Sequence, residues 1–178
     1  MRKIALLLPF LIAACSTVTE PQGGEAMPLI NGGGQTIGTI RAWQTAGGVS
    51  FQIQASGLPH GIHGVHVHSV GRCEGPAFNS AGPHWNPADK KHGMNNPAGP
   101  HAGDLPNVEV AANGVLGATL ALPNASLTAP AGAPGALVDQ DGSALVIHGG
   151  ADDYVTDPSG NSGPRIACAV LRSVAEVR

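Results

Sequence analysis

Residues 48–58, GVSFQIQASGL, alternate cleanly between apolar and polar side chains. In an extended strand, this pattern puts Val, Phe, Ile and Ala on one face and Ser and Gln on the other. Such a strand is half-buried and belongs to an antiparallel sheet. The preceding residues 36–45, TIGTIRAWQT, are its expected partner, and AGG at 46–48 is the expected hairpin turn. Any fold for this chain must accommodate this hairpin.

Glycine and proline are spread between apolar segments along the whole chain. The 178 residues include 26 Gly and 15 Pro, and their combined share lies just under the level typical of disordered chains. Aromatic residues are few, so Val, Ile, Leu and Ala must build the core. Further short β runs occur at 114–122, 144–148 and 165–174, with turn sequences at 111–114 and 139–142. No segment has convincing helical periodicity. The length suits one domain, and the pattern predicts an all-β sandwich or barrel.

Two long segments interrupt this pattern. Residues from Gly71 to about Asn107, and residues 149–164, show no strand signal. Loops of this length in a compact domain are usually functional. Six of the eight histidines lie between positions 60 and 92, so they gather in the first loop and at its edges.

The histidine spacing indicates metal binding. In GVHVH, residues 64–68, the alternation of a strand projects two imidazoles side by side, although a solvated strand face would give the same pattern. An exposed position of that kind is what we expect for His60. Further along the chain lie three imidazoles and one carboxylate: His84, His92, His101 and Asp104. Four such ligands make a closed tetrahedral zinc site. With the histidine that precedes the second loop, the candidate ligands number seven, more than one zinc ion can use: His66, His68, His84, His92, His101, Asp104 and His148.

The N-terminus predicts export. A basic start precedes an apolar run of eleven residues, Ile4–Ala14, which is too short to span a bilayer but suits a signal peptide. The sequence IAAC is typical of a bacterial lipoprotein, which predicts a signal peptide at 1–14, lipidation of Cys15 and a polar tether at 15–26. The alternative is an ordinary secretory signal with Cys15 incidental. The folded domain is expected at 27–178.

The remaining cysteines are Cys73 and Cys168. Two cysteines in an exported chain favour a disulfide, and the alternative is a pair of buried free thiols.

The net charge is −3, or −5 without the Arg2 and Lys3 of the leader. No basic cluster exceeds Lys90-Lys91, so nothing indicates a nucleic-acid partner. Because the net charge is negative, the chain as a whole repels a small anion, and local positive charge would have to attract it.

Five ordered segments carry a resemblance to the Cu,Zn superoxide dismutase family: GVHVHSVG, SAGPHWNPADKKHG, HAGDLPNV, LVIHGGADD and GPRIACAV. The resemblance covers nearly everything from about Met27 to Val174. It implies an immunoglobulin-like Greek-key β-sandwich or flattened barrel of about eight antiparallel strands, with the two long loops functional. It also implies copper and zinc as cofactors and superoxide as substrate.

The resemblance also distributes the ligands between two ions. Copper would be bound by His66, His68, His84 and His148. Zinc would be bound by His84, His92, His101 and Asp104, so that His84 bridges both metals as an imidazolate. Imidazole ligands suit copper, and the three-histidine, one-aspartate set suits zinc.

Three more residues take roles by resemblance. Asp152 would link a copper histidine to a zinc histidine and orient both rings, whereas the neighbouring Asp153 reads as a solvated loop acid. Arg165 would lie beside the copper, placed by the Cys73–Cys168 bridge, and orient the anion; the alternative is a surface arginine at a strand end. His63 would be buried and structural.

The implied mechanism is a ping-pong cycle in which superoxide first reduces and then oxidises copper, giving dioxygen and hydrogen peroxide. His84 and Arg165 are the catalytic residues, and His84 takes up and delivers a proton. The chain departs from the family in its short second loop, which has three aspartates and no lysine. By the same resemblance, Ser159 stands where many members carry a hydroxyl. We expect Lys90 and Lys91 to supply part of the attraction for superoxide instead.

Two other functions fit part of the pattern. A copper-buffering domain could keep the copper histidines but lose Arg165 and the zinc set, and both are present. A zinc hydrolase needs an open position on zinc and a general base, whereas Asp104 closes the set. The expected location is periplasmic, with the lipid anchor in the outer membrane because Ser16 follows Cys15. A homodimer is the oligomer to test.

Overall fold

The computed structural model describes residues 24–128 and 136–172. In these ranges the chain forms eight strands and one short 3₁₀ turn, η1. The predicted signal peptide and Cys15 lie outside the described residues. Nowhere in the described ranges is a helix long and apolar enough to cross a membrane. The elements, in chain order, are β1 (Met27–Asn31), β2 (Thr36–Thr45), β3 (Gly48–Ala55), β4 (Gly61–His68), η1 (Asn79–Ala81), β5 (Asp104–Val110), β6 (Leu116–Pro123), β7 (Ser143–His148) and β8 (Arg165–Leu171).

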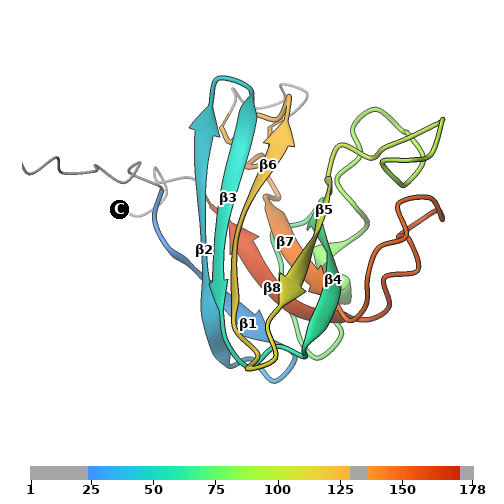
Figure 1. Cartoon of the computed structure of the whole chain (residues 1–178). Helices are drawn as coiled ribbons and strands as arrows, with labels where there is room; N and C mark the ends of the chain where they lie inside the picture. The colour runs from blue at the N-terminus through green and yellow to red at the C-terminus, as the bar shows by residue number, and fades with distance from the viewer. Residues whose placement is uncertain (1–23, 129–135, 173–178) are drawn as a thin grey trace, which may run out of the picture.

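All strand pairs are antiparallel, and the strands follow the order β5-β4-β7-β8-β1-β2-β3-β6. The sheet curls until its two end strands, β5 and β6, lie near each other, so the strands make a nearly closed, flattened barrel (Figure 1). The predicted all-β Greek-key class of about eight antiparallel strands is confirmed.

The predicted hairpin is confirmed. β2 occupies 36–45, as expected, and pairs with β3 along its length, with Thr45 opposite Gly48. Gly48 has φ +148 and begins β3, so only two residues, 46 and 47, connect the strands. Alternate residues of β3 are buried, as the sequence pattern predicts.

Two strands, β1 and β5, were not predicted from the sequence because each contains a proline. β5 begins at Asp104, so the first loop ends four residues earlier than the expected limit near Asn107. Pro106 lacks an N–H, but β5 is an end strand of the sheet, and there a missing donor is tolerated. β1 carries Pro28 in the part of the strand that pairs only with β2. The second loop, 149–164, lies between β7 and β8, as predicted.

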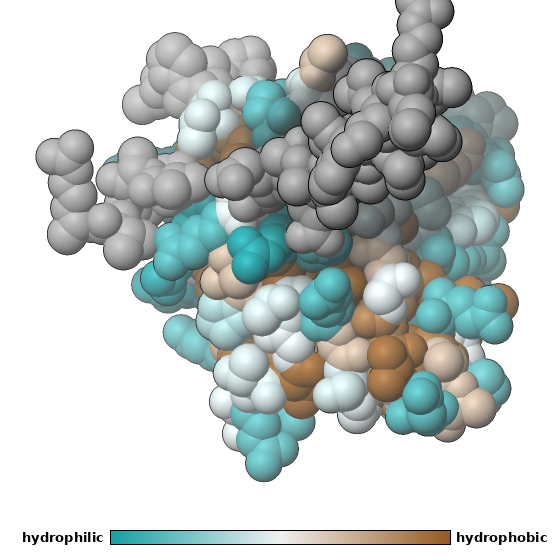
Figure 2. All heavy atoms as spheres, turned by 60° about the vertical axis from the view of Figure 1, so that its left-hand side comes forward, coloured by the Kyte–Doolittle hydropathy of each residue, from teal (hydrophilic) through white to brown (hydrophobic). Residues whose placement is uncertain are grey.

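The core fills the barrel mainly with aliphatic side chains, together with the aromatic rings of Phe51 and Trp85. A smaller group, here called the outer cluster, lies on the other face of β7 and β8 and consists of Phe78, Ala81, Ala144, Val146 and Cys168. On the side of β1 and β2, hydrophobic residues are scattered among hydrophilic ones (Figure 2). The long loops instead cover the outer face of β4 and β7, on the opposite side of the molecule (Figure 1).

Candidate metal centre

β4 carries both core and site residues. Val65 and Val67 point into the barrel core, while His66 and His68 point to the outer face. The histidines are nevertheless fully buried, because the first long loop crosses over them and forms an isolated bridge between His68 and His84. β7 lies beside β4 and ends at His148, which brings a further imidazole to the same face.

Four histidines form the first cluster: one ring nitrogen from each of His66, His68, His84 and His148 lies within 4.8 Å of the others. Three of them have a second nitrogen with a partner. His66 Nε2 donates to Asp152 Oδ2 at 2.7 Å, His68 Nδ1 to the Gly82 carbonyl at 2.8 Å, and His148 Nδ1 to the Gly163 carbonyl at 3.1 Å.

The opposite nitrogens of these three rings, His66 Nδ1, His68 Nε2 and His148 Nε2, are buried and have no hydrogen-bond partner. Because each ring donates through its other nitrogen, each orphaned nitrogen carries a lone pair. Buried polar atoms normally have partners, and three lone pairs in one cluster are what a metal ion with imidazole ligands requires. This part of the site therefore fits copper.

The second cluster surrounds the carboxylate of Asp104. Its Oδ1 lies 3.1 Å from His84 Nδ1, 3.0 Å from His92 Nδ1 and 3.4 Å from His101 Nδ1. Its Oδ2 accepts hydrogen bonds from the backbone amides of Gly93 and His101. The structure thus brings all four predicted zinc ligands together, and His84 belongs to both clusters.

The group of four residues whose ligand atoms lie mutually close in this second cluster differs from the predicted zinc set in one residue. It contains His66, His84, His92 and Asp104, with ligand atoms within 4.8 Å of one another, and leaves out His101. His66 enters because it pairs with Asp104 across β4 and β5 and its ring centroid is 4.0 Å from that of His84. His101 still contacts the cluster, with its Nδ1 at 3.3 Å from His84 Nδ1.

Asp152 connects the two clusters. Its Oδ2 accepts from His66 Nε2 at 2.7 Å and its Oδ1 lies 3.0 Å from His92 Nε2. The carboxylate is buried and therefore determines the orientation of one ring in each cluster. Asp153, beside it, is exposed and caps its own loop through Val155 and Thr156.

Electrostatics separate the two clusters. Burial, together with a smaller effect of neighbouring histidines, lowers the pKa of His66 to about 4, of His68 to about 2 and of His148 to about 3. These rings are therefore neutral at pH 7 and able to act as ligands.

The carboxylates behave differently. Burial by itself would raise the pKa of Asp104 and Asp152, but hydrogen bonds from histidine rings and backbone amides outweigh it and hold both pKa values well below the ordinary range. Burial likewise opposes charge on His92, yet its hydrogen bonds to both carboxylates raise its pKa to about 9. In the metal-free chain, the proton on His92 Nδ1 occupies the direction in which a cation would bind.

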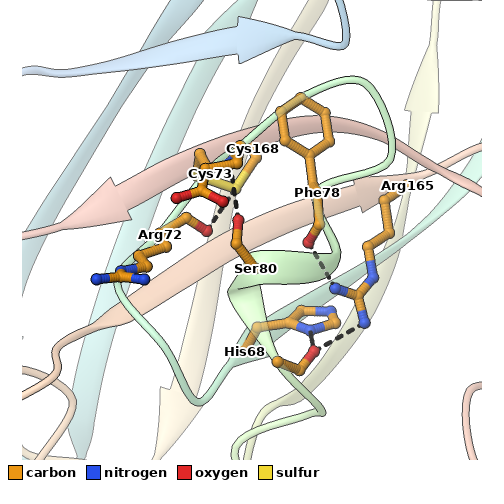
Figure 3. The surroundings of a disulfide bond; sticks show 9 residues. His68, Arg72, Cys73, Phe78, Ser80, Arg165 and Cys168 are labelled. Carbon is orange, nitrogen blue, oxygen red and sulfur yellow. Dashed lines mark hydrogen bonds between the residues drawn. A yellow bond between two sulfur atoms is a disulfide. The ribbon is translucent and has the colours of Figure 1, made fainter.

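Arg165 begins β8 opposite His148. Its Nη1 donates to the Phe78 carbonyl and its Nη2 to the Gly82 carbonyl, both at 2.7 Å (Figure 3). Arg165 also lines a cleft of about 940 Å³ together with His84, His148, Lys90 and Lys91. Arg165 is therefore half-buried at the start of β8, in the wall of a cleft that also exposes residues of both histidine clusters.

The Cys73–Cys168 disulfide is present and ties the first loop to β8 (Figure 3). The same loop segment carries Phe78, which is fully buried in the outer cluster. The disulfide and the buried Phe78 side chain therefore hold the part of the loop whose carbonyls, those of Phe78 and Gly82, accept hydrogen bonds from Arg165.

Other histidines lie as predicted. His63 is buried, with its ring nitrogens 2.7 Å from the His148 carbonyl and 2.8 Å from the Pro59 carbonyl, so it joins backbone segments. His60 is exposed. The structure adds residues that the sequence pattern did not indicate: Asn107 and Tyr154, which hold the Asp152 segment, and Asp157, which pairs with Lys91. No local pattern marks these residues, because their partners lie more than 40 positions away or act through the backbone.

Residues 36–171 match the family model for copper/zinc superoxide dismutase (SODC). The chain belongs to the copper/zinc superoxide dismutase family. Membership assigns it the oxidoreductase chemistry of superoxide dismutation, with copper and zinc as the family's cofactors.

Curated relatives within the copper/zinc superoxide dismutase family are similar over most of the chain. "Superoxide dismutase [Cu-Zn] 1" of Aquifex aeolicus is 43% identical over 145 residues, which cover 81% of this chain and 85% of that protein. "Superoxide dismutase-like protein YojM" of Bacillus subtilis is 44% identical over 150 residues, covering 83% and 76%.

Solved structures of this family agree with the fold. A superoxide dismutase-like protein from Bacillus subtilis superposes with a TM-score of 0.80 at 43% identity, over 84% of this chain and 99% of that chain. Cu/Zn superoxide dismutase from Brucella abortus superposes with a TM-score of 0.64 at 27% identity, over 83% and 99%. Because these relatives include a protein named only as dismutase-like, the metal ligands of each chain have to be considered individually.

Proposed function

We propose that this chain is a superoxide dismutase whose two metals share His84, with residue roles as follows. Copper would be held by His66 Nδ1, His68 Nε2, His148 Nε2 and a ring nitrogen of His84. Zinc would be held by the Nδ1 atoms of His84, His92 and His101 and by Asp104 Oδ1. The observation that carries the proposal is the set of three orphaned, buried ring nitrogens beside a carboxylate-centred cluster that shares one histidine with them.

When bound, copper supplies one-electron oxidation and reduction of superoxide, to dioxygen and hydrogen peroxide, while redox-inert zinc holds the loop and the shared ring. The protein supplies binding, orientation and protons.

Arg165 binds the incoming anion. Its guanidinium is held by two carbonyl oxygens, which leaves its remaining N–H groups to meet a small anion in the cleft. A preorganised cation of this kind needs no rearrangement when the anion arrives.

His84 holds and delivers a proton. Its Nδ1 faces Asp104, so Nε2 is the atom that remains for the first cluster and for proton exchange with the cleft. Asp152 keeps the rings of His66 and His92 in the required orientation throughout.

The decisive experiment combines metal analysis with a superoxide assay on purified protein, comparing the wild type with His84→Ala and, as a control, His60→Ala. We expect one copper and one zinc per chain in the wild type and in the control. His84→Ala should lose activity and weaken retention of both metals. Full metal loading without dismutation would refute the proposal and leave a copper-buffering role in its place.

The location is part of the same proposal. The disulfide supports an oxidising, exported compartment. We infer a signal peptide at 1–14, lipidation at Cys15 and a tether from 15 to 26, with the domain from 27 to 178 anchored to the outer membrane. Palmitate labelling and membrane fractionation of the wild type and Cys15→Ser test this, because the variant should lose both the label and the membrane association. Sedimentation of the tether-free domain tests the homodimer.

A further inference from the structure

Tyr154 is the only tyrosine of the chain and lies in the second long loop, two residues after Asp152. Its backbone has φ +63, a left-handed conformation that few non-glycine residues adopt. Such a conformation is unfavourable for a residue with a side chain and persists only where surrounding contacts enforce it. The contacts of Tyr154 are therefore informative.

Tyr154 makes three hydrogen bonds: one to β5, one to the first long loop and one within its own loop. Its phenol oxygen accepts from the backbone N–H of Asn107 in β5 at 2.7 Å. Its carbonyl accepts from the N–H of Asn95 in the first long loop at 2.9 Å. Its own N–H donates to Asp152 Oδ1 at 2.7 Å. One residue thus joins both long loops and the edge strand.

The partner on β5 holds the same aspartate. Asn107 Oδ1 accepts from the backbone N–H of Asp152 and Asn107 Nδ2 donates to the Asp152 carbonyl, each at 2.9 Å. The Asp152 main chain is clamped by the Asn107 side chain, and the Asn107 main chain is in turn bound by the Tyr154 phenol.

The first loop passes very close to Tyr154 next to a predicted zinc ligand. Gly93, with φ +110, follows His92, and a Cβ at this position would collide with the Tyr154 carbonyl. Close packing here leaves little freedom for the backbone beside His92.

We propose that Tyr154 is a positioning residue that fixes the Asp152 carboxylate between His66 and His92 and thereby sets zinc affinity. It touches neither predicted metal site directly and acts through Asp152 and the backbone next to His92. This inference rests on the proposed zinc set.

The test measures zinc binding to the metal-free protein by competition with a chelating dye, together with the visible spectrum of the cobalt-substituted protein. Tyr154→Phe removes the phenol acceptor and keeps the ring. A group that hydrogen-bonds directly to a metal ligand, as Asp152 does to His92, is worth about 10–100-fold in metal affinity, and Tyr154 acts through this group. We expect Tyr154→Phe to weaken zinc binding by about tenfold and to change the cobalt spectrum. Val155→Ala, an exposed neighbour in the same loop, is the matched control and should change neither.

A double variant separates positioning from a general structural effect. If Tyr154 acts through Asp152, then Asp152→Asn/Tyr154→Phe should bind zinc no more weakly than Asp152→Asn alone. Additive losses would overturn the proposal, as would wild-type affinity and spectrum in Tyr154→Phe. Should Tyr154→Phe fail to fold, Asn107→Ser removes the clamp on Asp152 from the other side, and an unchanged cobalt spectrum in that variant would also overturn it. Absence of zinc binding by the wild type would refute the zinc set itself, whereas wild-type binding with an unaffected Tyr154→Phe would refute only the role of Tyr154.

Discussion

The guanidinium of Arg165 donates to the carbonyl oxygen of Gly82 at 2.7 Å. The same oxygen accepts a hydrogen bond from His68 Nδ1 at 2.8 Å. One backbone atom of the first long loop therefore positions both Arg165, the proposed anion-binding residue, and a proposed copper ligand.

Arg165→Lys should reduce kcat/KM for superoxide by roughly 10–100-fold with both metals retained. Lysine keeps the charge but cannot make the two directed bonds and still face the cleft, and a hydrogen bond to a charged group is worth about 1.5–3 kcal/mol. Pulse radiolysis of the metal-loaded variant gives the rate. A wild-type rate would show that the orientation of the guanidinium is not needed.

Replacing both Cys73 and Cys168 by serine should lower stability and activity together. The bridge spans 95 residues, for which chain-entropy models give about 4–5 kcal/mol as an upper figure. The loop that supplies the carbonyls for Arg165 would then be held by the outer cluster alone. Urea unfolding and a superoxide assay on the same metal-loaded samples test this, and unchanged activity at reduced stability would uncouple the bridge from Arg165.

Asp152→Asn should weaken metal binding while leaving the fold intact. The amide cannot accept hydrogen bonds from His66 and His92 at both of its terminal atoms, so one ring loses its orienting partner. We expect a loss of about 10–100-fold in zinc affinity, measured by chelator competition. Asp153→Asn is the matched control because its side chain bonds only within its own loop and its exposed carboxylate does not contact a predicted ligand.

Lys90→Gln/Lys91→Gln should lower kcat/KM at low ionic strength by about two- to tenfold and flatten its dependence on salt. Both lysines line the cleft, and Lys91 also pairs with Asp157 at 3.2 Å. Arg41→Gln, an exposed charge on β2, serves as the control. The steering role is wrong if the salt profile of the double variant matches that of the wild type.

The metal-free protein should be most stable near neutral pH. His66, His68 and His148 have folded pKa values of about 4, 2 and 3, below the unfolded value of 6.5. As pH falls below 6.5, the unfolded chain takes up protons that the folded chain cannot, and stability falls by up to about 1.4 kcal/mol per pH unit for each histidine.

On the alkaline side the sign reverses. The folded pKa of His92 is raised to about 9, so its contribution is fully present below 6.5 and is lost as pH rises toward 9. Urea midpoints of the metal-free protein at pH 5, 7 and 9 should show the highest value at pH 7. Equal midpoints at pH 5 and 7 would contradict the burial of neutral imidazoles.

Local sequence patterns predicted the strands whose pairing depends on side-chain alternation. β2 and β3 were predicted nearly to the residue, because the period of two is clean and the turn between them is short. β1 and β5 were missed because Pro28 and Pro106 argue against strands, and only the finished sheet shows that both occupy positions where an N–H is dispensable.

The residues of the site could be predicted only in part from local sequence patterns. His66 and His68 follow from strand alternation, but nothing local brings His84, His92 and His101 back over β4; the resemblance to a family provided that. Asn107 and Tyr154 could not be predicted, because their roles come from backbone hydrogen bonds between segments 45 to 47 residues apart.

The two faces of β4 have a consequence for folding. If β4 slipped by one residue against β5 and β7, Val65 and Val67 would point toward the proposed metal centre, and His66 and His68 would point into the apolar interior. A chain paired in this way could not pack its hydrophobic core, and it could not bind a metal ion. Binding of both metals therefore requires the native register of β4, so metal content reports whether the strand is correctly paired.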